Sequence, residues 1–148
     1  MEGVMDDMVQ RAKELAYRAH AGQVDKAGRP YIEHVARVAA AVADDPEAEV
    51  VAWLHDVLED CEFVDVRTLD SMFPPRIVGA VEALTRQHFS ETGWYYAAVV
   101  SDPISLRVKL ADIADNSDET RLALLDEKTA ARLRRKYAKA RKALGVDE

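Results

Sequence analysis

Cysteine is nearly absent from this 148-residue chain: Cys61 stands alone, so no disulfide can form within it. Glycine and proline are also scarce, with six and five residues. The overall composition is that of an ordinary globular protein. No apolar run approaches the roughly 20 residues that span a bilayer. The opening residues, MEGVMDDMVQ, lack the basic and apolar regions of a signal peptide. These absences predict a cytoplasmic protein with no membrane partner.

Basic charge is concentrated near the C-terminus. Residues 128–142 hold eight Lys or Arg and no acid, so the rest of the chain carries −15 against a total of −7. Nucleic acid is therefore not an expected partner. The basic segment also has an apolar stripe, typical of a helix packed on a core. That stripe consists of Leu133, Tyr137, Ala140 and Leu144.

Helix signals dominate, and no alternating strand pattern, linker or repeat is visible. Asp45-Pro46 and Asp102-Pro103 each combine a capping side chain with a proline suited to the first helical turn. Helices are expected over 5–20, 30–44, 46–60, 66–72, 75–86, 91–100, 103–116 and 126–144, with Gly145 as a C-cap. The sequence therefore predicts an all-α protein with a single domain over residues 1–148.

The segment WLHDVLED, residues 53–60, carries an unusual concentration of negative charge. On a helix, His55, Asp56, Glu59 and Asp60 would share one face, and acids four residues apart repel each other. They also fall near the expected helix end, where the helix dipole disfavours negative charge. A cation bound among these side chains would relieve both effects.

His55 and Asp56 diverge by about 100° on a helix, so further ligands must come from other helices. His34 lies beside the apolar stripe of the second helix, and Asp112 lies between Leu110 and Ile113. A buried carboxylate needs a partner. The predicted ligands are His34, His55, Asp56 and Asp112, a mixed N/O set that suits Mn²⁺ or Fe²⁺ and tolerates Co²⁺ or Zn²⁺.

Three segments carry a family resemblance: AHAGQVDKAGRPYIEHVARVA, WLHDVLED and RVKLADIADN. They resemble the HD phosphohydrolase superfamily, and more closely the hydrolase domain of RelA/SpoT proteins and small stand-alone alarmone hydrolases. The matching pattern is a PYxxH stretch ending at His34, an HDxxED motif from His55, and an LAD at Asp112 followed four residues later by Asn116. The resemblance runs from about residue 19 to 116 and implies an HD-fold helical bundle.

The resemblance also implies roles. His34, His55, Asp56 and Asp112 would hold Mn²⁺, while Glu59 and Asp60 would position and deprotonate the attacking water. Lys26, Tyr31 and Asn116 would bind the substrate. The implied reaction removes the 3′-pyrophosphate from guanosine 3′,5′-bis(diphosphate), ppGpp.

The chain departs from the family at two places. The family arginine that stacks on guanine falls at Asp25, and Asn116 is followed by Ser117, Asp118 and Glu119 rather than by a hydrophobic residue, Arg and Thr. Both changes lie where the base and ribose would be recognised. They keep open other HD nucleotide phosphatases, acting on NADPH or a nucleoside monophosphate.

Plainer roles remain alternatives for several residues. His34 is also compatible with a surface or capping role, Glu59 and Asp60 with solvated acids, and Asp112 with an ion pair to Lys109. Asn116 suits a helix C-cap, and Lys26 suits a solvated loop. A catalytically silent HD domain that binds a nucleotide or a protein is the alternative from another class. The sequence leaves a homo-oligomer possible.

Overall fold

Aspartate side chains define where several helices begin. In this computed structural model, which describes residues 2–147 apart from the side chains of residues 2 and 60, Asp45 caps α3 (Pro46–Leu54) by accepting the Glu47 backbone N–H at 3.1 Å. Asp102 caps α8 (Pro103–Asn116) in the same way, through the Ile104 N–H at 2.9 Å. Both prolines occupy the first helical turn, as the sequence predicts.

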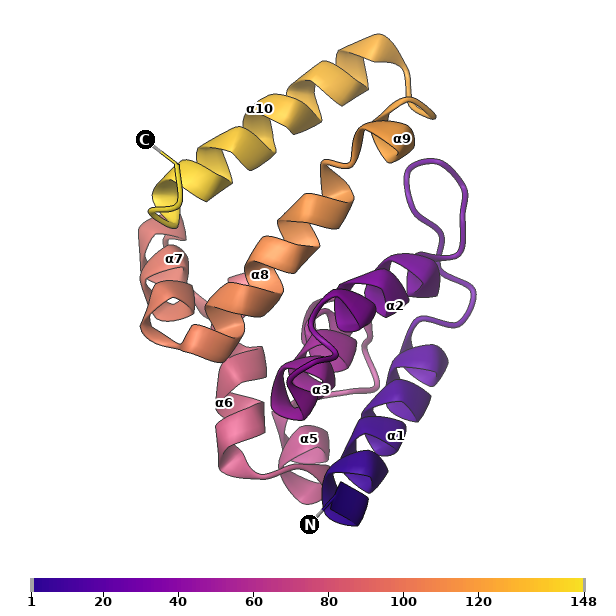
Figure 1. The fold of residues 1–148 in the computed structure, drawn as a ribbon, viewed down its shortest axis with the longest axis vertical. Helices are drawn as coiled ribbons and strands as arrows, with labels where there is room; N and C mark the ends of the chain where they lie inside the picture. Colours follow the sequence, from indigo (N-terminus) through magenta and orange to yellow (C-terminus); the bar gives the residue numbers. More distant parts are fainter. Residues whose placement is uncertain (1, 148) are drawn as a thin grey trace.

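Helix α3 forms the centre of the protein. Its residues from Val50 to Leu54 are all buried and all apolar, whereas its two acids, Glu47 and Glu49, lie in its first turn. Helices α1 (Glu2–Ala19) and α2 (Tyr31–Ala41) pack against it, and α8 packs against both α2 and α3 (Figure 1). The hydrophobic core lies among these four helices and extends into the segment from Val57 to Val99.

Shorter elements complete the bundle. They are α4 (Val57–Asp60), α5 (Val66–Met72), α6 (Pro75–Ala83), the 3₁₀ turn η1 (Arg86–His88), α7 (Thr92–Ser101) and α9 (Glu119–Leu122). Residues 2–147 contain an isolated bridge between Val24 and Pro30 but no strand, so the fold is all-α. The sequence did not predict α9 or η1.

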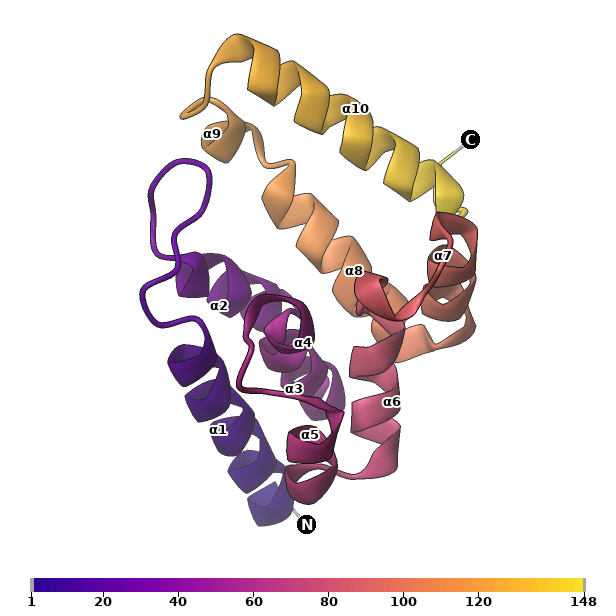
Figure 2. The same ribbon diagram turned by 180° about the vertical axis from the view of Figure 1, so that it is seen from behind.

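The last helix, α10 (Glu127–Ala143), runs alongside α8, as both ribbon views show (Figure 2). Leu133, Ala140 and Leu144 are buried, which confirms the predicted apolar stripe. Gly145 follows with a φ of 80°, the left-handed conformation expected after a helix end. None of the helices in residues 2–147 combines the length and apolar character that crossing a bilayer requires.

Candidate metal centre

The His55-Asp56 dipeptide lies at a break between two helices. Helix α3 ends at Leu54, and α4 begins at Val57. The sequence prediction of one continuous helix through residues 53–60 is therefore wrong. The break matters because adjacent side chains on a continuous helix diverge by about 100°, whereas here His55 Nε2 lies 3.0 Å from Asp56 Oδ2.

The ring of His55 is fixed by its own helix. His55 Nδ1 lies 2.6 Å from the backbone oxygen of Ala52. Since a carbonyl oxygen only accepts hydrogen bonds, Nδ1 carries the proton and donates it. Nε2 is thereby directed to the interior, where it meets both Asp56 and Asp112.

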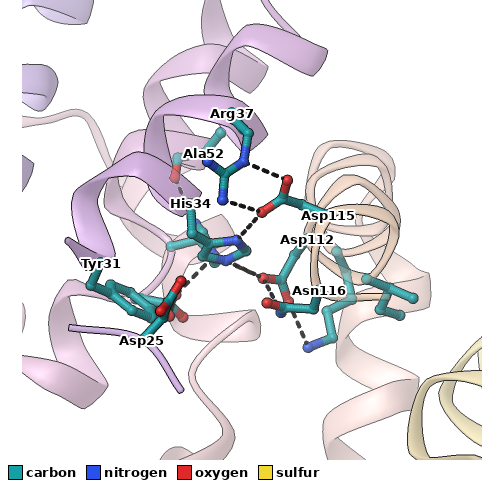
Figure 3. A network of polar contacts seen from close by, with 12 residues as sticks. Asp25, Tyr31, His34, Arg37, Ala52, Asp112, Asp115 and Asn116 are labelled. Carbon is teal, nitrogen blue, oxygen red and sulfur yellow. Dashed lines mark hydrogen bonds and ion pairs between the residues drawn. The ribbon is translucent and has the colours of Figure 1, made fainter. Parts of the chain in front are cut away.

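Four predicted ligands converge from separate elements. His34 on α2, His55 and Asp56 at the α3–α4 break, and Asp112 on α8 each offer one ligand atom, and these atoms lie within 4.8 Å of one another. His34 Nε2 is 2.9 Å from Asp112 Oδ1, and His55 Nε2 is 3.3 Å from the same oxygen. Figure 3 shows His34 and Asp112 facing each other across the gap between α2 and α8.

The electrostatics of this cluster suit a cation. Burial alone would lower the pKa of His55, but the carboxylates of Asp56 and Asp112 outweigh burial and raise that pKa well above its usual value. Burial would likewise raise the pKa of Asp112, but Lys109 and the two histidines hold it well below the usual range. The interior therefore stabilises positive charge between two carboxylates, and two imidazoles with two carboxylates form a donor set that fits a divalent transition metal.

Asp115 is a functional candidate that the sequence prediction missed. Its Oδ2 lies 2.6 Å from His34 Nδ1, on the side of the ring opposite Asp112, as Figure 3 shows. Arg37 and Arg121 also donate to this carboxylate, at 2.7 and 2.8 Å. A carboxylate behind a histidine commonly orients that histidine toward a metal. The available signal was the spacing of three residues from Asp112, which places both on one side of α8.

Asp56 and Asp112 have further partners. The Tyr31 hydroxyl donates to Asp56 Oδ2 at 2.5 Å. Lys109 Nζ lies 3.2 Å from Asp112 Oδ2, and Asn116 Nδ2 donates to Asp112 Oδ1 at 3.1 Å. The Lys109–Asp112 ion pair, considered above as an alternative role for Asp112, thus exists alongside the histidine contacts rather than replacing them. The Asn116 side chain faces the cluster.

Glu59 lies on the one-turn helix α4 beyond Asp56. Its carboxylate accepts the backbone N–H of Arg86, so η1 fixes its position. Burial raises the pKa of Glu59, and the nearby negative charge of Asp56 adds to that effect. The predicted partner acid, Asp60, has a side chain outside the described residues.

A cavity of about 400 Å³ adjoins the cluster. Lys26, Tyr31 and Asn116, the three predicted substrate-binding residues, all line it. Tyr31 and Asn116 also contact Asp56 and Asp112, so these two residues join the cavity to the cluster. Arg121 and residues of α10 form another part of the wall.

The structure is thus an all-helical bundle in which two histidines and two aspartates from three helical regions form a candidate metal centre. The model of the HD domain matches residues 12–93, and the chain belongs to the HD domain family. HD domains are metal-dependent, in agreement with the His/Asp cluster. The matched range includes His34, His55 and Asp56, while Asp112 lies beyond it.

Relatives extend the comparison. The chain is 34% identical over 119 residues to a guanosine-3′,5′-bis(diphosphate) 3′-pyrophosphohydrolase of Aquifex aeolicus, covering 73% of this chain and 17% of that protein. It is 33% identical over 119 residues to a GTP pyrophosphokinase of Streptomyces coelicolor, covering 73% of this chain and 14% of the relative. The chain thus spans less than a fifth of these relatives.

A solved structure confirms the fold. A metazoan orthologue of SpoT, described as hydrolysing ppGpp, superposes with a TM-score of 0.76 at 20% identity. The match covers 93% of this chain and 85% of that chain. The predicted HD-type helical fold is therefore confirmed over most of the chain.

Proposed function

We propose that this protein is a metal-dependent phosphohydrolase that removes the 3′-pyrophosphate of ppGpp or of a related nucleotide. The observation that carries the proposal is the convergence of His34, His55, Asp56 and Asp112 beside a cavity lined by lysine, tyrosine and asparagine. The names of the relatives from Aquifex aeolicus and of the metazoan SpoT orthologue support the choice of ppGpp.

The four clustered side chains would be the metal ligands, with Mn²⁺ as the expected ion. A bound divalent cation lowers the pKa of water and neutralises charge on the phosphate that is attacked. The remaining work falls to protein side chains. Asp115 orients His34, Tyr31 orients Asp56, and Lys109 balances the charge of Asp112.

Glu59 is the proposed proton acceptor, with Asp60 as its partner. Backbone N–H groups of Arg86 and Gln87 hold the Glu59 carboxylate in place. A raised pKa makes this carboxylate a better base than an ordinary surface glutamate. In the proposed reaction, Glu59 takes a proton from the water while the oxygen of that water forms a bond to the 3′-linked phosphorus. The bond from this phosphorus to the ribose 3′ oxygen breaks, and the 3′ oxygen takes up a proton to become the hydroxyl of GDP.

Substrate binding is assigned to Lys26, Tyr31 and Asn116. Lys26 carries a positive charge on the loop beside the cavity, and no ion pair engages it within the described part of the chain. A phosphate group entering the cavity would meet this charge. Asn116 would contact the ribose or its phosphate from α8.

The test is hydrolysis of ppGpp by the purified chain with Mn²⁺, with GDP and pyrophosphate as the expected products. The His55→Ala, Asp56→Ala double variant is expected to lose this activity. Glu59→Gln is expected to reduce kcat by about 10²–10⁴-fold while Mn²⁺ still binds. Glu62→Gln, an exposed acid in the following turn, is the matched control and is expected to retain activity.

A substrate panel separates the alternatives. Release of phosphate from NADPH or deoxynucleoside monophosphates, with ppGpp left intact, would show that the substrate is another nucleotide and not ppGpp. Stoichiometric Mn²⁺ binding without turnover of any of these compounds would indicate a binding domain without catalysis. Hydrolysis that persists in the double variant would contradict the metal-dependent mechanism.

A further inference from the structure

An ion pair joins two distant segments at the cavity. Arg121 Nη2 on α9 lies 3.0 Å from Asp25 Oδ2 in the loop before α2. Asp25 also organises its own loop, because Oδ1 accepts the backbone N–H groups of Ala27 and Arg29, both at 2.9 Å. The ribbon views place this loop beside α9 (Figure 1, Figure 2). Asp25 is therefore a fixed anchor for Arg121.

The hydrogen-bonding edges of Arg121 are engaged on several sides. Nη1 donates to Asp115 Oδ2 at 2.8 Å, to the Asp115 backbone oxygen at 3.1 Å, and to Asn116 Oδ1 at 3.3 Å. With Asp25, the guanidinium thus meets two carboxylates, which offset its charge. Arg121 is consequently a poor site for a further phosphate group.

The flat face of a guanidinium remains available when its edges are engaged. The side chain of Arg121 is 23% exposed, and it lines the 400 Å³ cavity. A guanidinium held in plane by carboxylates is a platform on which an aromatic ring stacks. Leu124, which is 65% exposed, lines the same cavity and adds apolar surface.

The ammonium groups at the cavity have a different character. Lys26 and Lys136 line it, and neither has an ion-pair partner among residues 2–147. Burial lowers the pKa of Lys136, and the positive charges of Lys109 and Lys26 lower it further. Positive charges that repel one another across a cavity favour a bound anion. The cavity lining therefore combines a flat guanidinium whose charge is balanced with two ammonium groups that have no ion-pair partner in the described part of the chain.

We propose that Arg121 is the specificity-determining residue of the cavity, with its guanidinium stacking on the base of a bound purine nucleotide while Lys26 and Lys136 meet phosphate. This inference rests on the proposed function to the extent that a nucleotide occupies the cavity. The inference adds the residue that recognises the base and assigns different parts of the nucleotide to different residues of the cavity.

The test measures binding in EDTA, so that no turnover occurs. Guanosine 5′-monophosphate and ribose 5-phosphate are titrated calorimetrically into the wild-type chain, since these two probes differ only by the base. The wild type is expected to prefer the nucleotide. Arg121→Lys keeps the positive charge but removes the flat surface, and it is expected to weaken nucleotide binding about tenfold while changing ribose 5-phosphate binding less than about twofold.

Two further variants keep the test decisive. Arg134→Lys is the matched control, because Arg134 is an exposed arginine on α10 that pairs with Glu119, and it is expected to bind both probes like the wild type. Arg121→Gln retains a planar side chain with a hydrogen-bond donor. Its affinity for guanosine 5′-monophosphate is expected to lie between those of the wild type and Arg121→Lys. Melting temperatures show whether each variant is folded. If Arg121→Lys does not fold, Arg121→Gln is compared with the wild type instead.

Three results would overturn the inference. They are an equal loss for both probes in Arg121→Lys, no wild-type preference for the nucleotide, or an unchanged affinity in every folded Arg121 variant. Wild-type turnover of ppGpp is measured separately. Base-dependent binding through Arg121 without ppGpp hydrolysis would refute the proposed function alone, whereas hydrolysis with no effect of Arg121 on base recognition would refute this inference alone.

Discussion

Replacing Asp115 by asparagine is expected to weaken metal binding without removing a ligand. In the structure, His34 stands between two carboxylates, with Asp112 at Nε2 and Asp115 at Nδ1. A negatively charged acceptor at Nδ1 keeps the proton there, leaves the Nε2 lone pair for the ion, and makes the imidazole a stronger donor. Asparagine preserves the size of the side chain and one oxygen acceptor but removes the charge.

The magnitude follows from what the variant loses. Loss of such an orienting group typically costs 10–100-fold in metal affinity, about 1.4–2.7 kcal/mol. Because the asparagine oxygen can still accept from His34, we expect Asp115→Asn to lie near the tenfold end. Asp115→Leu removes both the charge and the acceptor, so we expect it to approach the hundredfold end.

Calorimetric titration of Mn²⁺ into the ion-free chain measures this effect directly and does not depend on catalysis. Arg37→Gln is the control, because Arg37 contacts Asp115 from the outside and is 45% exposed. We expect that variant to change the Mn²⁺ affinity by less than about threefold. A folded Asp115→Asn protein with wild-type affinity would refute the argument that Asp115 controls His34.

The remaining predictions concern stability. Mn²⁺ at about 100 times its Kd adds about 2.7 kcal/mol, so the melting temperature should rise by roughly 5–10 °C and fall back with EDTA; an unchanged melting temperature would contradict a metal centre. Leu69→Ala should lower the free energy of unfolding in urea by about 2–5 kcal/mol, because Leu69 is fully buried, whereas exposed Phe63→Ala should change it by less than about 0.5 kcal/mol. Gly28→Ala should destabilise by about 1–2 kcal/mol, because Gly28 has a φ of 81°. Gly79→Ala, within α6 and with open space around it, should instead stabilise by up to about 1 kcal/mol; similar effects at the two glycines would contradict the backbone argument.

Local signals were sufficient to predict most helices, and the resemblance to a known motif added the cluster of histidines and aspartates. Asp45-Pro46 and Asp102-Pro103 mark helix starts by chemistry that acts within a few residues, and the structure contains both caps. The two histidines and two aspartates are brought together as predicted. Their resemblance to a known motif supplied the long-range information that periodicity lacks.

The break at His55-Asp56 was not predictable from the hydrophobic pattern. Residues 53–60 fit a continuous helix, with Trp53, Leu54 and Val57 on one side. The structure departs from it because His55 Nδ1 bonds to the Ala52 oxygen and its Nε2 meets carboxylates from two directions. Polar contacts within the segment, together with one contact to Asp112 on α8, thus accompany the break, and the departure occurs at the residues that form the cluster.

The Asp25–Arg121 pair shows a second limit of sequence reasoning. In the sequence, Asp25 occupies the position where the family has the arginine that stacks on guanine. This substitution by itself indicated only that recognition of guanine is lost. The two residues are 96 positions apart, and the short helix that carries Arg121 was not predicted. The structure brings the guanidinium of Arg121 to the same cavity, where it pairs directly with Asp25.

Helix α8 links the candidate metal centre to the cavity. Lys109, Asp112, Asp115 and Asn116 recur at spacings of three and four, so they share one side of this helix. Asp112 contacts both histidines, Asp115 contacts His34 and Arg121, and Asn116 lines the cavity. A shift of α8 along its axis would therefore move the proposed ligand Asp112, the carboxylate of Asp115 and the cavity wall together. Because α10 packs on the same helix and carries Lys136, the C-terminal segment beyond the matched HD region affects the position of all three.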